Sequence, residues 1–245
     1  HDCWAFTGHC AHFTYVKCDK WKAGCGNGCP QLGTCPKTYS KASCAWNFDQ
    51  KRRLFNLVPA GRMRLITPSQ WLANLVAESF LSKYPVEVRH NTIDTSVFKP
   101  TPSDFRERYG IGDRFMILGV ASPWTERKGL ADFVRLAGEL DSEKCAIVLV
   151  GLSEKQVKGM PAGIVGLART DSREELAGIY STADVFFNPT VEDNYPTVNL
   201  EAEACGTPVV TYDTGGCRET ICGADSCAVP GYEAAAYYLK DVSHE

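Results

Sequence analysis

The chain has 245 residues, of which 44% are hydrophobic and 22% are charged, and its formal net charge is −3. These values are ordinary for a globular protein and exclude wholesale disorder. Because the charge creates no basic surface field, nucleic acid is not an expected partner. No apolar run approaches the roughly 20 residues that a membrane span requires. The sequence opens with His1-Asp2-Cys3-Trp4 and not with Met, and we interpret this start as a truncation.

The first 36 residues are rich in Cys, Gly, His and Trp and predict an irregular segment. Seven of the chain's twelve cysteines lie before residue 45: Cys3, Cys10, Cys18, Cys25, Cys29, Cys35 and Cys44. Cys10, Cys18, Cys25 and Cys29 have spacings that a structural zinc site can use, with His9, His12, Cys3 and Cys35 as further candidate ligands. The spacing is not the compact paired pattern of most zinc sites. Reduced cysteines packed in a core and, less favoured, disulfides therefore stay as alternatives.

Hydrophobic periodicity then predicts alternating helices and strands. Before residue 92 we expect a helix within 37–60, a strand at 63–67, a helix over 71–80 capped by Ser69, and a strand at 86–88. The polar stretch 92–103, which contains Pro100 and Pro102, predicts a domain linker.

Beyond the linker the expected strands are 115–120, 146–150, 164–165, 185–187 and 209–212. The expected helices are an apolar stripe from 130 to 136, a helix that a capping-box pattern opens at Ser172 and that runs to Tyr180, and 198–205. Almost continuously apolar strands that alternate with helices predict an α/β fold with a parallel sheet covered on both faces. Such sheets bind ligands beyond the carboxyl ends of their strands.

The segment that follows the predicted strand 185–187 carries the strongest chemical signal. Glu192 and Asp193 lie in a polar loop, Pro196 opens a helix, and Glu201 lies on that helix eight residues after Asp193. The unpaired N–H groups at a helix N-terminus suit a diphosphate. The helix acid can accept both hydroxyls of a ribose, and a loop acid can face a sugar beyond the phosphates.

This arrangement resembles the acid-x7-Glu motif of glycosyltransferase family 4. The family's strand entry is similar to Ala204-Cys205-Gly206-Thr207-Pro208-Val209, and its Gly-Gly turn to Gly215-Gly216, with Glu219 in the segment after it. The family's first acid is normally Glu, which Asp193 replaces here, and the neighbouring Glu192 is the alternative.

Three further segments share this resemblance, and together they extend it along nearly the whole chain. Arg127-Lys128-Gly129 resembles the family's Lys-Gly segment, whose Lys meets the donor phosphates, and Arg127 can supply a second charge. Asn91-Thr92-Ile93-Asp94 is similar to its linker motif. The opening Trp4-Ala-Phe-Thr-Gly-His-Cys10 and the turn Thr67-Pro-Ser-Gln-Trp-Leu72 resemble the branch that builds bacterial capsule and exopolysaccharide chains.

The resemblance implies an organisation of two Rossmann-like domains (GT-B type), with the chain truncated at both ends. Residues 1–91 would be the C-terminal part of an incomplete acceptor-side domain, 92–103 the linker, and 104–245 a nearly complete donor-binding domain. It also implies a retaining hexosyltransferase that moves a sugar from a nucleotide-diphosphate-sugar to an acceptor hydroxyl, with no metal in catalysis. The site residues that it implies are His1, Asp193 and Glu192 as catalytic residues, and Arg127, Lys128, Asn194, Tyr195, Pro196, Thr197, Val198, Glu201, Gly215 and Gly216 as donor-binding residues.

The expected acceptor is a saccharide or a lipid-linked saccharide in cell-surface polysaccharide synthesis. The expected location is the cytoplasm, with peripheral contact at the inner face of the membrane. Two alternatives stay open: a nucleotide-sugar epimerase or another enzyme on the same fold, and a non-catalytic binding fragment.

Overall fold

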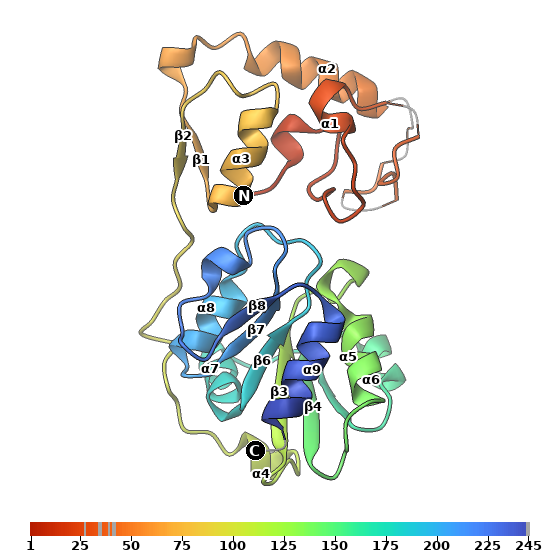
Figure 1. The fold of residues 1–245 in the computed structure, drawn as a ribbon, viewed down its shortest axis with the longest axis vertical. Coiled ribbons are helices and arrows are strands. Elements are labelled where there is room, and N and C mark those ends of the chain that lie inside the picture. Colours follow the sequence, from red (N-terminus) through yellow and green to blue (C-terminus); the bar gives the residue numbers. More distant parts are fainter. Residues whose placement is uncertain (27, 34–35, 39, 41–42, 244–245) are drawn as a thin grey trace. The chain divides into compact units, whose positions relative to one another are not determined.

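The computed structural model describes residues 1–26, 28–33, 36–38, 40 and 43–243. The chain forms two compact units (Figure 1). Unit 1 comprises His1–Asn91 together with Glu192–Tyr195, and unit 2 comprises Thr92–Val191 and Pro196–Glu245.

Unit 2 is built on a six-stranded parallel sheet with the strand order β5-β4-β3-β6-β7-β8. The strands are β3 (Phe115–Val120), β4 (Cys145–Val150), β5 (Ile164–Leu167), β6 (Val185–Asn188), β7 (Val209–Tyr212) and β8 (Cys227–Val229). Ile117 in β3 pairs with Ile147 on one side and with Val185 on the other, which places β3 at the centre.

Alternate residues of the central strands face two separate apolar cores, as the period of two along a strand requires. Met116 and Leu118 face one core, which includes residues of the helices α4, α7 and α8. Ile117 faces the other core, which α5 and α9 cover. The helices of unit 2 are α4 (Phe105–Arg108), α5 (Leu130–Ala137), α6 (Glu154–Gly159), α7 (Arg173–Thr182), α8 (Thr197–Ala204) and α9 (Tyr232–Val242). Helices therefore cover both faces of the sheet (Figure 1).

The strand order reverses next to β3. The chain runs from β3 outward through β4 to β5 and then returns to β6, on the other side of β3. Loops that leave β3 and β6 at their carboxyl ends therefore diverge, and such a switch point is where open α/β sheets bind ligands.

Unit 1 contains a much smaller sheet, in which β1 (Leu65–Thr67) and β2 (Val86–Val88) pair in parallel. Its other elements are α1 (Lys20–Ala23), α2 (Ser43–Phe55), α3 (Gln70–Glu78) and the 3-10 turns η1 (Trp4–Phe6) and η2 (Ala60–Arg62). The core centres on the aromatic cluster of Phe6, Phe13 and Trp21, with ring centroids 5.1 to 6.3 Å apart.

Most of the elements predicted from the sequence are confirmed, including the strand at 115–120 and the helix capped by Ser69, whose side chain accepts a hydrogen bond from the Leu72 N–H. The strand expected at 63–67 begins only at Leu65, since η2 ends at Arg62 and Met63 is the residue that caps it. The sequence pattern does not predict the short helices α1 and α4, nor α6, β8 and α9.

The capping box predicted at Ser172 is only half formed. The Ser172 side chain accepts from the Glu175 N–H, but the Glu175 carboxylate accepts from the N–H of Asp171 instead of returning to Ser172. The complete capping box lies at Ser153 and Gln156, at the start of α6.

Within the described residues, every helix is too short or too polar to cross a lipid bilayer.

Candidate functional site

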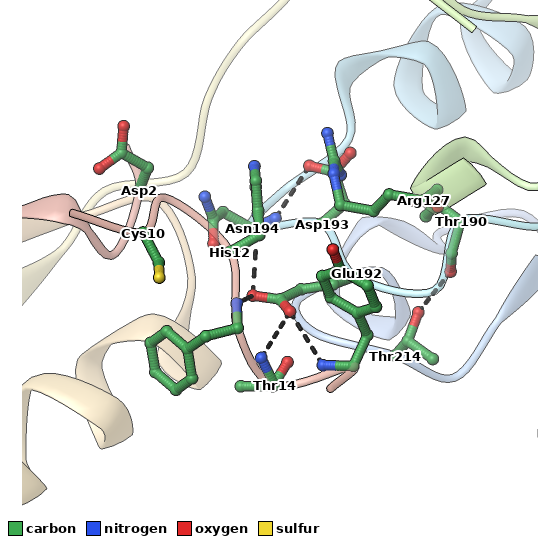
Figure 2. Close-up of polar contacts among 12 residues, drawn as sticks. Asp2, Cys10, His12, Thr14, Arg127, Thr190, Glu192, Asp193, Asn194 and Thr214 are labelled. Atoms are coloured by element: carbon green, nitrogen blue, oxygen red, sulfur yellow. Dashed lines mark hydrogen bonds and ion pairs between the residues drawn. The ribbon is translucent and has the colours of Figure 1, made fainter. Parts of the chain in front are cut away.

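Three loops meet at the carboxyl edge of the unit 2 sheet, where β3, β6 and β7 end. They are η3 (Glu126–Lys128) after β3, residues 189–191 after β6, and residues 213–216 after β7. The carbonyl oxygen of Arg127 accepts from the Val191 N–H at 2.9 Å and from Thr190 Oγ1 at 3.3 Å. Thr214 Oγ1 in turn donates to the Thr190 carbonyl at 2.7 Å (Figure 2). One backbone hydrogen bond and two hydrogen bonds from threonine hydroxyls therefore hold the Arg127-Lys128 segment beside the other two loops.

Gly129 allows the first of these loops to approach the second. Its φ is +75°, in the left-handed region, and a Cβ at this position would lie 2.3 Å from the Pro189 carbonyl oxygen. Only glycine satisfies both conditions without a backbone shift. Gly129 thus lets the loop that contains Lys128 lie directly against Pro189, in the loop that follows β6.

The N-terminus of α8 lies at the same edge of the sheet. Pro196 is the N-cap residue and makes no side-chain capping hydrogen bond, so the helix begins with the backbone N–H groups of Thr197 and Val198. A buried amide chain fixes the helix, since Asn188 donates to Asn199 and Asn199 donates to Thr220, both at 2.8 Å.

Glu201 lies one turn into α8 and is partly buried. The hydroxyl of Tyr180, in α7, donates to its Oε2 at 3.1 Å. Burial raises the pKa of Glu201, while the Tyr180 hydrogen bond and the charge of Arg173 oppose that rise. Its carboxylate is thereby oriented by a neighbouring helix.

The Gly215-Gly216 turn follows β7. Gly215 adopts a φ of 57°, in the left-handed region, and Gly216 is buried. Within unit 2 the structure therefore brings Arg127, Lys128, the start of α8 and this turn to one edge of the sheet.

Glu192 belongs to unit 1 and is fully buried, with 0% of the residue exposed. Its carboxylate accepts three consecutive backbone N–H groups, those of Phe13 at 3.1 Å, Thr14 at 2.7 Å and Tyr15 at 3.1 Å (Figure 2). We call this arrangement the Glu192 clamp.

The surroundings of the Glu192 clamp favour the ionised carboxylate. Burial raises the pKa of Glu192, but His12 and the hydrogen bonds from residues 13–15 outweigh burial, and the pKa lies below its ordinary value. His12 Nδ1 lies 3.7 Å from Glu192 Oε1, which is within ion-pair distance.

The other predicted residues of this loop make contacts within unit 1. Asp193 Oδ1 accepts from the Asn194 N–H at 2.8 Å, and Asn194 Nδ2 donates to the His1 carbonyl at 2.5 Å. Tyr195 stacks on His90 with ring centroids 4.8 Å apart. His1 and Asn194, which are 193 residues apart in sequence, are therefore in direct contact.

Sequence reasoning missed the residues that hold these segments in place. Thr190 and Thr214 link the loops of unit 2, and Asn199 links α8 to its surroundings, but each is a common polar residue without a distinctive spacing. The sequence suggests His12 only as a metal ligand. Its approach to Glu192 joins two residues that are 180 positions apart in the chain.

The four cysteines predicted to bind zinc line one small cavity in unit 1. The described cysteines of this unit form no disulfide. Cys35 lies outside the described part of the chain.

Comparisons with known proteins agree with this arrangement. The family model of glycosyl transferases group 1 matches residues 114–241, which is 128 of the 245 residues. The chain belongs to this family. The match covers the six strands and the loops at their carboxyl ends, so it contains Arg127, Lys128, Glu201 and the Gly215-Gly216 turn.

Two curated relatives illustrate the range of the family. The chain is 31% identical over 172 residues to a GDP-mannose-dependent α-(1-6)-phosphatidylinositol monomannoside mannosyltransferase of Mycolicibacterium smegmatis. The matched region covers 62% of this chain and 45% of the relative. The chain is also 26% identical over 160 residues to a processive diacylglycerol α-glucosyltransferase of Acholeplasma laidlawii. This second matched region covers 61% of this chain and 48% of the relative. The chain thus spans about half the length of these relatives.

Solved structures show the same fold. Anabaena Alr3699/HepE in complex with UDP-glucose matches with a TM-score of 0.62 and 20% identity, over 80% of this chain and 57% of that one. A sucrose-phosphate synthase of Thermosynechococcus elongatus matches with a TM-score of 0.66 and 19% identity, over 80% of this chain and 53% of that one. The predicted fold class, α/β of the GT-B type, is confirmed.

Proposed function

We propose that unit 2 binds a nucleotide-diphosphate-sugar and that the protein transfers its sugar to an acceptor hydroxyl with retention of the anomeric configuration. The observation that carries this proposal is that Lys128 and the start of α8 follow β3 and β6, the two neighbouring strands at the switch point of the sheet. A diphosphate at this edge would meet cations and backbone N–H groups together.

Arg127, Lys128 and the N–H groups of Thr197 and Val198 would neutralise the charge that develops on the departing diphosphate. Preorganised donors of this kind stabilise a transition state more than a ground state, because the charge on the leaving oxygen grows as the sugar bond breaks. A phosphate oxygen would take the proton of the acceptor hydroxyl, which attacks from the face that the diphosphate leaves.

Glu201 would accept the hydroxyls of the ribose, in an orientation that Tyr180 supports. For the acid nearest the transferred sugar we propose Asp193, which is partly exposed. The Glu192 carboxylate already accepts hydrogen bonds from three backbone N–H groups, so we assign this residue a positioning role. We keep His1, Asn194 and Tyr195 as proposed contacts of the sugar side, and Gly215 and Gly216 as proposed backbone contacts of the donor.

For the acceptor we propose a saccharide or lipid-linked saccharide in cell-surface glycan or glycolipid synthesis, met by peripheral contact at the cytoplasmic face of the membrane. The curated relatives support a lipid-linked acceptor, since their names specify phosphatidylinositol monomannoside and diacylglycerol. Those names also specify GDP-mannose in one relative, and a structural neighbour is complexed with UDP-glucose, so both bases belong in any test.

Calorimetric titration of this chain with UDP, GDP and ADP tests the donor proposal. We expect one of the three nucleotides to bind, and Glu201→Gln to weaken its affinity about tenfold. Glu143→Gln, at the opposite edge of the sheet, should leave the affinity unchanged. If none of the nucleotides binds, the donor proposal fails. Release of the nucleoside diphosphate without an acceptor, accompanied by an altered donor sugar, would favour an epimerase.

A further inference from the structure

Four cysteines from an irregular segment of unit 1 converge on one cavity. Cys10, Cys18, Cys25 and Cys29 all line it, and Phe13 and Trp21 complete its apolar wall. Its volume is about 10 Å³, which is close to the room that one water molecule requires. A space of this size accommodates a single atom or ion and no organic ligand.

Two of the four cysteines, Cys10 and Cys29, have their sulfur atoms close enough for one ion to bridge them. Atoms of His9, Cys10 and Cys29 lie within 4.8 Å of one another. In a tetrahedral site with zinc–sulfur bonds of about 2.3 Å, neighbouring sulfur atoms lie about 3.8 Å apart, so the Cys10 and Cys29 sulfurs need to approach by at most about 1 Å.

His9 lies beside the cysteines with its ring fixed. Its Nε2 lies 2.9 Å from the Gln31 carbonyl oxygen, and its Nδ1 lies 3.8 Å from Cys10 Sγ and 3.3 Å from Cys44 Sγ. His9 is therefore an alternative ligand. Cys18 and Cys25, however, line the cavity directly, whereas neither His9 nor Cys44 does.

A cation in the same core would offset the negative charge of a thiolate cluster. Lys51 Nζ donates to the carbonyls of Trp4 at 2.6 Å and Thr7 at 3.0 Å, and Thr7 lines the same cavity as the four cysteines. A zinc ion with four thiolates carries two negative charges, so a nearby ammonium group stabilises it.

We propose that Cys10, Cys18, Cys25 and Cys29 bind one structural Zn²⁺ ion that orders the Glu192 clamp. Phe13, Thr14 and Tyr15, which supply the three N–H groups, lie between Cys10 and Cys18 in the sequence. An ion that joins these two cysteines closes a short loop around the three donors and reduces its conformational freedom. This proposal is independent of the proposed transferase function, because its tests need neither donor nor acceptor.

Metal analysis of the purified full chain tests the site. We expect about one zinc per chain, and after exchange a cobalt derivative with thiolate-to-metal charge-transfer bands and the intense visible bands of tetrahedral Co²⁺. Cys18→Ala and Cys25→Ala should abolish stoichiometric zinc. Cys3→Ala, which alters a fully buried cysteine of the same core that does not line the cavity, should retain it.

Two outcomes would overturn the proposal. One is a folded, fully reduced chain that contains no zinc and gains none from added Zn²⁺. The other is zinc that survives Cys18→Ala but is lost in His9→Ala and Cys44→Ala, which would assign the ion to a different ligand set. Because Cys18→Ala can fail to fold, Cys18→His provides the second variant, and it should retain zinc since histidine also binds this ion.

Amide hydrogen exchange measures the link to the Glu192 clamp. Chelation should accelerate exchange at residues 13–15 at least tenfold and leave β3 and β4 of unit 2 unchanged. Unchanged protection at residues 13–15 in the zinc-free chain would refute the ordering role.

Discussion

The two units differ in what holds them together. In unit 2, six strands place alternate apolar residues into two cores, and side chains such as Phe186 and Phe133 are fully buried there. In unit 1, the sheet has two strands of three residues each, and much of residues 1–33 is irregular. Buried polar groups therefore have a larger share in fixing unit 1: the Glu192 clamp, Lys51 on two carbonyls, and the cysteine cluster. One chain thus combines unit 2, which an apolar pattern specifies, with unit 1, which depends more on particular polar contacts.

A substitution in the apolar core of unit 2 should cause the greatest loss of stability. Phe186→Ala in β6 removes a side chain that packs against Tyr180, with ring centroids 5.5 Å apart. We expect a loss of about 4 kcal/mol in the unfolding free energy of unit 2, from lost burial and the cavity left behind. Urea denaturation followed by far-ultraviolet circular dichroism measures it, and the loss should be the same at pH 7 and pH 5. A pH-dependent loss would contradict an apolar origin.

Glu192→Gln tests the buried polar contacts of unit 1. An amide has one acceptor oxygen where the carboxylate has two, so at least one buried N–H of residues 13–15 loses its partner. We expect a loss of about 3 kcal/mol in the stability of unit 1 at pH 7. Four of the five tryptophans lie in unit 1, so tryptophan fluorescence follows its unfolding.

The pH dependence of this loss follows from the lowered pKa of Glu192. The carboxylate stabilises the fold fully above its unfolded pKa, about 4.5, and this stabilisation disappears as the pH falls through the lower folded pKa. The difference between wild type and Glu192→Gln should therefore shrink only below about pH 4.5.

Glu203→Gln is the matched control in unit 2. Glu203 also accepts backbone N–H groups, those of Cys222 and Gly223, but it does so near the surface. Water can replace the lost acceptor there, so we expect a cost below about 1 kcal/mol. Equal costs for Glu192 and Glu203 would show that burial is not what makes the Glu192 clamp important.

Lys128→Ala separates binding from stability. If Lys128 meets the donor phosphates, its removal should weaken nucleoside diphosphate affinity about 30-fold, or about 2 kcal/mol, with little change in unfolding. Lys144→Ala, at the opposite edge of the sheet, should bind as wild type does. Calorimetric titration measures both, and an unchanged affinity in Lys128→Ala would remove this residue from the site.

The smallest expected effect concerns a helix cap. Ser172→Ala removes the acceptor for the Glu175 N–H at the start of α7, and we expect a loss of about 1 kcal/mol. Urea denaturation measures it, and donor affinity should not change. A loss above about 2 kcal/mol would show that the cap supports more than its own helix.

Local sequence patterns predict five of the six strands of unit 2, three of its helices and the edge of the sheet at which the site residues lie. This is because hydrophobic period, glycine turns and the residues that follow each strand are local properties. Lys128 after β3 and Pro196 before α8 could be placed this way without coordinates. The missed α9 also had a local signal, since Ala235, Ala236 and Leu239 are buried at helical spacing after Gly231.

The different contacts of the adjacent acids Glu192 and Asp193 are visible only in the tertiary structure. Nothing local distinguishes them, and the three N–H groups that engage Glu192 lie 177 to 179 residues away in the chain. The same holds for the cysteines, whose convergence on one cavity depends on an irregular backbone that no periodicity predicts. Contacts between distant segments depend on how the whole chain packs, which a local pattern does not encode.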